Sequence, residues 1–242
     1  MESLTVATGL LALIAIFASF VISASAGLGG SLLLVPALVL VLGPKEGVAL
    51  AALLLGANNL VKVIAYRATL PWKKALPIVL LISLGAWLGA TLLVRASDQM
   101  VGIAVVTAFG LTLVLERLRW RPGRRVAGPV MAFGSGAVSG FSGTSGPLKG
   151  AAIRNLDLDR FHFVGAASLA SLAGDLTKVS VFTEAAILGR SSYAAALVAV
   201  PLMLAGTLLG RTFNQRTGER GFAILFWSVM AGYTFRLVSA II

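Results

Sequence analysis

Two glycine-rich stretches interrupt long apolar runs and decide how this chain can fold. They read GFSGTSGP at residues 140–147 and GLGG at residues 27–30. Glycine allows backbone geometries that other residues cannot adopt. A half-helix that starts after such a break turns its backbone N–H groups and the positive end of its dipole toward the break. Two matched breaks predict an anion site at the membrane midplane; the alternative is that the glycines form tightly packed helix seams.

The composition places the chain in a membrane. Of its 242 residues, 58% are hydrophobic and 12% are charged, whereas soluble domains average about 25% charged residues. Crossing the hydrocarbon core takes about 20 apolar residues, and eight long apolar segments can be drawn at roughly 4–26, 46–66, 74–94, 100–118, 126–143, 162–183, 191–210 and 221–241. The first is expected to be a retained helix rather than a signal peptide, because it is preceded by Glu2 and no basic residue.

Two shorter apolar pieces, 31–43 and 146–153, follow the glycine breaks. Short interrupted segments of this kind are typical of re-entrant or broken helices that are buried in protein. The sequence therefore predicts an all-α integral membrane protein. It has about eight transmembrane helices in two repeats, each with a glycine-interrupted short or re-entrant helix.

The two halves match when the sequence is shifted by 116 residues without gaps. Leucine matches are common in such a composition, so the polar matches are the informative ones. Lys62 falls on Lys178, Arg95 on Arg211, and Gln99 on Gln215. We interpret this as an internal duplication, with a first transmembrane repeat at 1–118, a basic cytoplasmic linker at 119–125 and a second repeat at 126–242.

The linker region sets the expected topology, because arginines concentrate there and basic loops stay in the cytoplasm. Counting outward places Arg67, Lys73, Lys74 and Arg190 on the cytoplasmic side. This favours four spans and one broken element per half, with parallel repeats. Five spans per half would instead make the repeats inverted. The sequence does not decide between an even and an odd number of spans per half.

Polar residues within the spans are the candidates for a binding site, because ionisable groups are costly there. Asn58 and Lys62 share one helix face, as do Asp175 and Lys178. In the alternative interpretation the lysines reach the interface and Asp175 only neutralises Lys178. The predicted substrate-binding residues are Gly27, Gly29, Gly30, Asn58, Asn59, Lys62, Gly143, Thr144, Ser145, Gly146, Lys149, Asp175 and Lys178.

The same composition limits cofactors and partners. The chain has no cysteine and one histidine, which excludes thiolate and histidine-cage metal sites, and its net charge of +11 fits basic loops beside an anionic leaflet. We expect no catalytic residue, metal, cofactor or nucleic acid. The expected partners are a small anion, the lipid bilayer and H⁺ as candidate coupling ion, with Glu46, Asp175 and Glu184 as candidate carboxylates; the oligomeric state stays open.

Two other functions compete with transport of an anion. The stretch 140–143 reads Gly-Phe-Ser-Gly and resembles the nucleophile region of rhomboid-type intramembrane serine proteases. That chemistry needs a histidine base within hydrogen-bond reach of Ser142, and only His162 is available. The remaining alternative is a channel or a membrane scaffold that transports nothing.

The order of several short motifs resembles the sulfite exporter TauE/SafE family of bacterial membrane permeases. They include the glycine run that leads to Pro36, Asn59, the stretch LPWKKALP at 70–77, and the span ends GATLL at 89–93 and GTLL at 206–209. The resemblance implies transport of sulfite, a sulfonate such as sulfoacetate or a related organic anion across the bacterial inner membrane, coupled to an ion gradient, and it leaves the direction of transport open. Ser145 and residues 154–157 depart from the family pattern and leave the exact substrate open.

Overall fold

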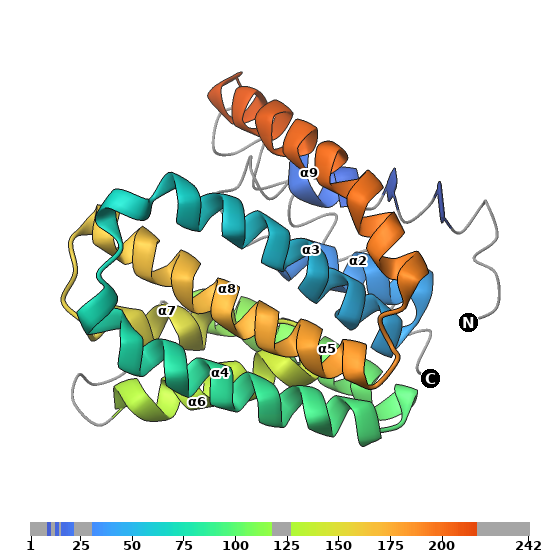
Figure 1. Cartoon of the computed structure of the whole chain (residues 1–242), viewed down its shortest axis with the longest axis horizontal. Helices are drawn as coiled ribbons and strands as arrows, with labels where there is room; N and C mark the ends of the chain where they lie inside the picture. Colours follow the sequence, from blue (N-terminus) through green and yellow to red (C-terminus); the bar gives the residue numbers. More distant parts are fainter. Residues whose placement is uncertain (1–8, 11–12, 15, 22–30, 118–126, 217–242) are drawn as a thin grey trace.

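The computed structural model describes residues 9–10, 13–14, 16–21, 31–117 and 127–216, and every regular element in this part of the chain is helical (Figure 1). The labelled elements are α2 (Ser31–Leu42), α3 (Pro44–Ala65), the 3₁₀ turn η1 (Arg67–Thr69), α4 (Trp72–Arg95), α5 (Asp98–Arg117), α6 (Ala127–Ser142), α7 (Gly146–Arg154), α8 (Arg160–Glu184) and α9 (Arg190–Arg216).

The hydropathy pattern predicts these helices closely. The apolar segments 46–66, 74–94, 100–118, 126–143 and 162–183 correspond to α3, α4, α5, α6 and α8, and the short pieces 31–43 and 146–153 to α2 and α7. Helix α9 continues past the predicted end at 210 to Arg216, because a helix does not stop where its apolar residues stop. The segment 221–241 and much of 4–26 lie outside the described residues.

The second glycine break separates two helices that form a re-entrant hairpin. Helix α6 ends at Ser142, residues 143–145 are non-helical, and α7 begins at Gly146. Gly143 has φ +79°, a left-handed conformation that favours glycine. A Cβ atom on Gly128 would lie 3.1 Å from the Asn155 side chain, so α7 returns to the end of the bundle where α6 began. The predicted short helix after a glycine interruption is present at this break, whereas Gly27, Gly29 and Gly30 lie outside the described residues.

Helices α3 and α8 run in opposite directions (Figure 1). A Cβ atom on Gly165 would lie 2.7 Å from the Thr69 carbonyl oxygen. This short distance shows that α8 starts close to the point where α3 ends. We call this the Lys74 end of the bundle and the opposite one the Lys45 end. Helix α8 has 25 residues and is therefore about 37 Å long, which puts Arg190 at the Lys45 end. The expectation that Arg190 lies on the same side as Lys74 is wrong, and so is the parallel direction expected for these two helices.

Helices α4 and α6 pack along a seam of glycines. A Cβ atom on Gly85 or Gly89 would lie 2.1 Å from a carbonyl oxygen of α6, and one on Gly136 or Gly140 would lie 2.1 or 2.5 Å from a carbonyl oxygen of α4. No side chain fits at such distances, so the two backbones touch directly. The seam interpretation therefore holds for Gly140, while Gly143 makes the break.

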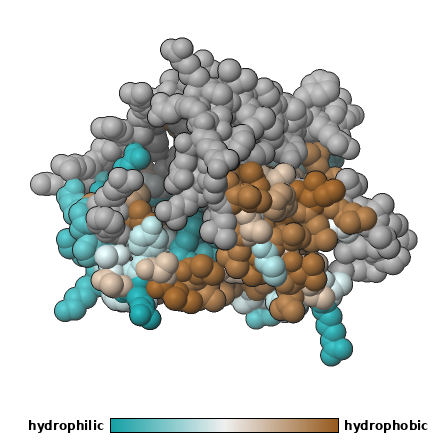
Figure 2. All heavy atoms as spheres, turned by 90° about the horizontal axis from the view of Figure 1, so that it is seen from above, coloured by the Kyte–Doolittle hydropathy of each residue, from teal (hydrophilic) through white to brown (hydrophobic). Residues whose placement is uncertain are grey.

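The outer surface of the bundle is strongly apolar, as Figure 2 shows on one face, with hydrophilic side chains at the margins. Large exposed apolar side chains include Leu80, Leu84 and Trp87 on α4, and Leu197 on α9. By length and composition, α3 and α4 can each cross a membrane, and shorter apolar helical stretches cover 31–42, 98–112 and 190–206. This surface suits hydrocarbon better than water.

Candidate functional site

A buried polar cluster lies where α3, α6 and α8 meet. The Lys178 ammonium is 2.7 Å from an Asp175 carboxylate oxygen, and it donates a hydrogen bond of 3.1 Å to the Ser139 hydroxyl on α6. The other Asp175 oxygen accepts a hydrogen bond of 2.8 Å from the Asn59 side chain on α3. Sequence positions far apart are thus joined by one carboxylate.

The members of this cluster are enclosed by protein. The exposed fraction is 2% for Lys178, 6% for Asp175 and 9% for Asn59. A lysine that reached the interface would expose its ammonium, so that interpretation is wrong for Lys178. Burying a charge costs several kcal/mol unless it is paired and hydrogen-bonded, and both requirements are met here. The ion pair that the neutralisation of Lys178 by Asp175 requires is present.

Two further lysines lie close enough to the same carboxylate to interact with it electrostatically. Lys149 on α7 interacts electrostatically with Asp175, Lys178 and Lys62, and Lys62 on α3 also interacts with Asp175. Among the residues that the structure describes, neither Lys62 nor Lys149 forms an ion pair. Lys149 is half-buried, whereas Lys62 lies on the exposed last turn of α3. With its three lysines charged and one carboxylate ionised, the cluster has a formal charge of +2.

The lysine cluster lies beside the start of α7. The buried N-cap residue Ser145 makes no side-chain cap hydrogen bond. Because Pro147 has no N–H, the first-turn donors without a helical acceptor are those of Gly146 and Leu148. These donors and the positive end of the α7 dipole point toward the break, an arrangement that suits anions.

The start of α2 approaches this break. The Ser31 hydroxyl lies 3.4 Å from the buried Thr144 hydroxyl, and a Cβ atom on Gly143 would lie 2.9 Å from Val35 on the first turns of α2. The amino ends of the two short helices therefore meet inside the bundle. Ser31 directly follows Gly30, which lies outside the described residues.

The structure thus brings together five of the ten predicted site residues that it describes. Asn59, Lys62, Lys149, Asp175 and Lys178 form one electrostatic cluster. Asn58 is half-buried on the neighbouring position of α3, and no described contact ties it to the cluster.

Two serines at the site were missed by the sequence analysis. Ser139 contacts Lys178, and Ser31 contacts Thr144. Both are short polar residues in apolar helices, a pattern that is common in membrane segments, and no spacing rule distinguishes them. Ser139 is distinguished only by its position on α6, about one helical turn before the break.

The cluster is not built for a cation. Its one carboxylate is already engaged by Lys178 and Asn59. Within the described ranges, no group of three or more His, Asp or Glu side chains could hold a metal ion.

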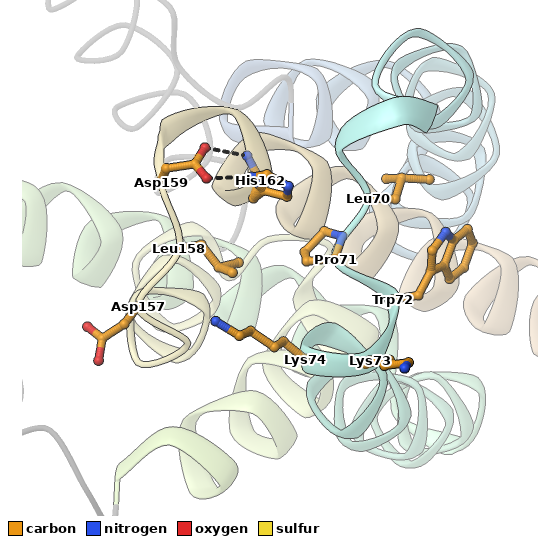
Figure 3. Close-up of a pocket in the computed structure, with 9 residues that line it drawn as sticks. All are labelled: Leu70, Pro71, Trp72, Lys73, Lys74, Asp157, Leu158, Asp159 and His162. Carbon is orange, nitrogen blue, oxygen red and sulfur yellow. Dashed lines mark hydrogen bonds and ion pairs between the residues drawn. The ribbon is translucent and has the colours of Figure 1, made fainter.

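A separate surface cleft of about 520 Å³ opens at the Lys74 end. Residues 70–74 line one wall, and residues 157–159 with His162 line the other (Figure 3). His162 is held by Asp159, which also accepts its backbone N–H, and Lys74 extends toward the wall that carries Leu158. This cleft is distinct from the lysine cluster.

The two residues of the protease alternative are not brought together. The Ser142 hydroxyl donates to the carbonyl oxygens of Val138 and Thr144 at 2.8 and 3.3 Å. His162 lines the cleft at the Lys74 end and precedes Lys178 by 16 residues of α8, or about 24 Å of helix. The structure therefore does not show the serine–histidine contact that a nucleophilic mechanism needs.

The helical architecture, the apolar outer surface and the two long apolar helices fit a multi-pass membrane protein with a buried lysine–aspartate pair. The chain belongs to the sulfite exporter TauE/SafE family, whose family model matches residues 11–237. Membership indicates a membrane transporter of sulfite or related anions and confirms the resemblance noted in the sequence. No curated protein and no solved structure matched the chain.

Proposed function

We propose that this protein is a secondary transporter that exports sulfite, a sulfonate or a related organic acid across the bacterial inner membrane, with the lysine cluster as its anion site. The observation that carries this proposal is the charge balance of the cluster. Lys178 pairs with a single carboxylate, Asp175, and Lys62 and Lys149 interact with the same carboxylate electrostatically. Uncompensated positive charge inside a membrane protein is expensive, and a bound anion of small size would neutralise it.

The three lysines have different roles in this proposal. Lys178 already has Asp175 and Ser139 as partners, whereas Lys62 and Lys149 have no ion-pair partner in the described part of the chain. We therefore assign direct anion contact to Lys149 and Lys62, assisted by the backbone donors at the start of α7. In the empty site, Lys178 is held by Asp175 and Ser139.

Alternating access would come from two inverted repeats that rock against each other. Asn59 and Asp175 are 116 positions apart and touch each other, as equivalent residues do on a two-fold axis. The opposite directions of α3 and α8 fit the inverted arrangement.

The part of the cluster formed by Lys178 and Asp175 is closed in this conformation, because both residues are almost fully buried. Lys62 is exposed and Lys149 is half-buried, so an anion bound at these two lysines would reach Lys178 only if helices around the break move apart. We propose that the cleft at the Lys74 end is the vestibule on the cytoplasmic side, since α5 ends and α6 begins at that end, on either side of the basic linker in the sequence.

Uptake of labelled sulfite into proteoliposomes tests this function. The wild-type protein should transport sulfite with saturation, at rates far below those of an open channel. Replacing Lys149 or Lys62 by Gln removes a charge-assisted contact worth about 1.5–3 kcal/mol. The concentration for half-maximal uptake should therefore rise about tenfold or more.

Lys45→Gln is the matched control, because Lys45 pairs with Asp98 at the far end of the bundle. It should transport as the wild type does. If neither sulfite nor a small sulfonate moves, the protein is not the proposed transporter. If Lys149→Gln and Lys45→Gln behave alike, transport occurs elsewhere in the molecule.

A further inference from the structure

We propose that Asp175 is the carboxylate that couples anion transport to proton transport. In the empty site it is the internal counter-anion of the lysine cluster, and when the transported anion arrives it takes up one proton. The proton comes from the side on which the anion enters, and it leaves with the anion on the other side. This inference rests on the proposed function and names the coupling group of the same site.

Burial selects Asp175 from the three carboxylates considered for coupling. Glu46 lies exposed on the first turn of α3, and Glu184 lies exposed at the end of α8. Among the carboxylates whose side chains the structure describes, Asp175 alone is buried. A proton bound by an exposed carboxylate exchanges with solvent in every conformation, so only an enclosed group can carry one from side to side.

The groups around Asp175 explain why a proton and an anion would bind together. Lys178 faces it from its own helix, Asn59 and Lys62 from α3, and Lys149 from α7. Helix α6 contributes Ser139 through Lys178, and the neighbouring part of α4 contributes apolar Ile82 and Ala86 beside Gly174.

Protonation of Asp175 would raise the formal charge of the cluster from +2 to +3, with all three lysines charged. The added positive charge strengthens the attraction for an anion. By reciprocity, a bound anion strengthens proton binding by the same factor.

Asp175 also lies where the two repeats would move relative to each other. It joins Asn59 on α3 to Lys178 on α8 at the crossing of these helices. A neutral carboxylic acid keeps the hydrogen bond to Asn59 but loses most of its attraction for Lys178. Protonation would therefore release Lys178 toward the anion at the contact about which the repeats rock.

The duplication supplies a conservative variant for the test. The first repeat has Asn59 at the position equivalent to Asp175, so Asp175→Asn places in the second repeat the side chain already found in the first. This variant mimics the protonated state and cannot exchange a proton. Sulfite in the buffer supplies the missing negative charge next to Lys178.

Three measurements on full-length protein test the proposal. In proteoliposomes with labelled sulfite and a pH-sensitive dye inside, the wild type should transport one proton more per anion than Asp175→Asn. Sulfite carries a proton of its own as bisulfite, and this contribution cancels in the comparison. Exchange of sulfite at equal concentrations on both sides should persist in the variant. Sulfite should also raise the melting temperature of Asp175→Asn more than that of the wild type.

The control variants Glu46→Gln and Glu184→Gln should keep the wild-type proton ratio. An equal ratio in Asp175→Asn and wild type overturns the coupling role, and so does a folded Asp175→Asn that neither takes up nor exchanges sulfite. If Asp175→Asn does not fold, calorimetry of the wild type in buffers of different ionisation enthalpy decides, at a pH where sulfite is a dianion. Binding without proton uptake then overturns the proposal. If the wild type transports no anion at all, it is the proposed function that fails.

Discussion

The close packing of α4 against α6 can be tested at two glycines of α6, Gly134 and Gly136, which differ in what lies beside them. A Cβ atom on Gly136 would lie 2.1 Å from the Ile82 carbonyl oxygen and 2.8 Å from the Ala86 nitrogen, whereas one on Gly134 meets nothing within 4 Å. In Gly136→Ala the helices must separate by about 1.3 Å to reach an ordinary contact of 3.4 Å. Overpacking of this kind costs about 1–3 kcal/mol, and a wider gap along the seam also loses dispersion contacts.

Gly134→Ala should stabilise the protein slightly, since alanine favours a helix by up to about 1 kcal/mol over glycine. For a chain of this size, 1 kcal/mol shifts the melting temperature by about 2–4 °C. We expect Gly136→Ala to melt several degrees below Gly134→Ala in lipid nanodiscs. Equal melting temperatures for these two variants would refute the close backbone contact and, with it, the position of α6 relative to the buried cluster.

Two further perturbations address the cluster and the break. Lys178→Met should lower the unfolding free energy by about 3–5 kcal/mol, because it leaves the Asp175 carboxylate buried without its partner, and adding Asp175→Leu should recover most of the loss in a thermal melt. Gly143→Ala forces an alanine into φ +79° against Val35, which costs about 1–2 kcal/mol for the backbone alone. It should lower both stability and sulfite uptake, whereas Gly150→Ala, with open space at its Cβ position, should change neither; similar effects of the two substitutions would show that the break is not needed.

Prediction of the helices from sequence succeeded because hydropathy follows the chain locally. A run of apolar residues of the right length has to be helical inside a bilayer, since every backbone N–H and C=O must be paired within the segment. The bounds of α3, α4 and α8 follow from this rule alone, and so does the interruption between α6 and α7. The candidate residues were found for a related reason, because a charge in an apolar helix is conspicuous.

The directions of the helices and the contacts between their side chains could not be predicted from hydropathy. A glycine run predicts a tightly packed helix seam as readily as a break between helices. Only the backbone distances at Gly140 and the positive φ of Gly143 distinguish the two roles. Lys62 and Lys178 are matched by the 116-residue shift on which the predicted repeat rests, yet Lys62 is exposed and Lys178 is only 2% exposed. Counting basic residues placed Arg190 at the wrong end, because a re-entrant helix reverses direction without crossing.

The amino-acid sequence by itself determined that this chain is a helical membrane protein, where helices α2 to α9 lie, that α6 and α7 are interrupted, and which polar side chains interrupt the apolar background. These properties depend on the transfer of each local segment from water to hydrocarbon. The tertiary structure decided that α7 turns back, that α3 and α8 run in opposite directions, and that Asn59, Asp175 and Lys178 share one buried contact. Contacts between residues more than a hundred positions apart depend on how helices pack, and packing is set by shape across neighbouring helices rather than by the order of residues along one of them.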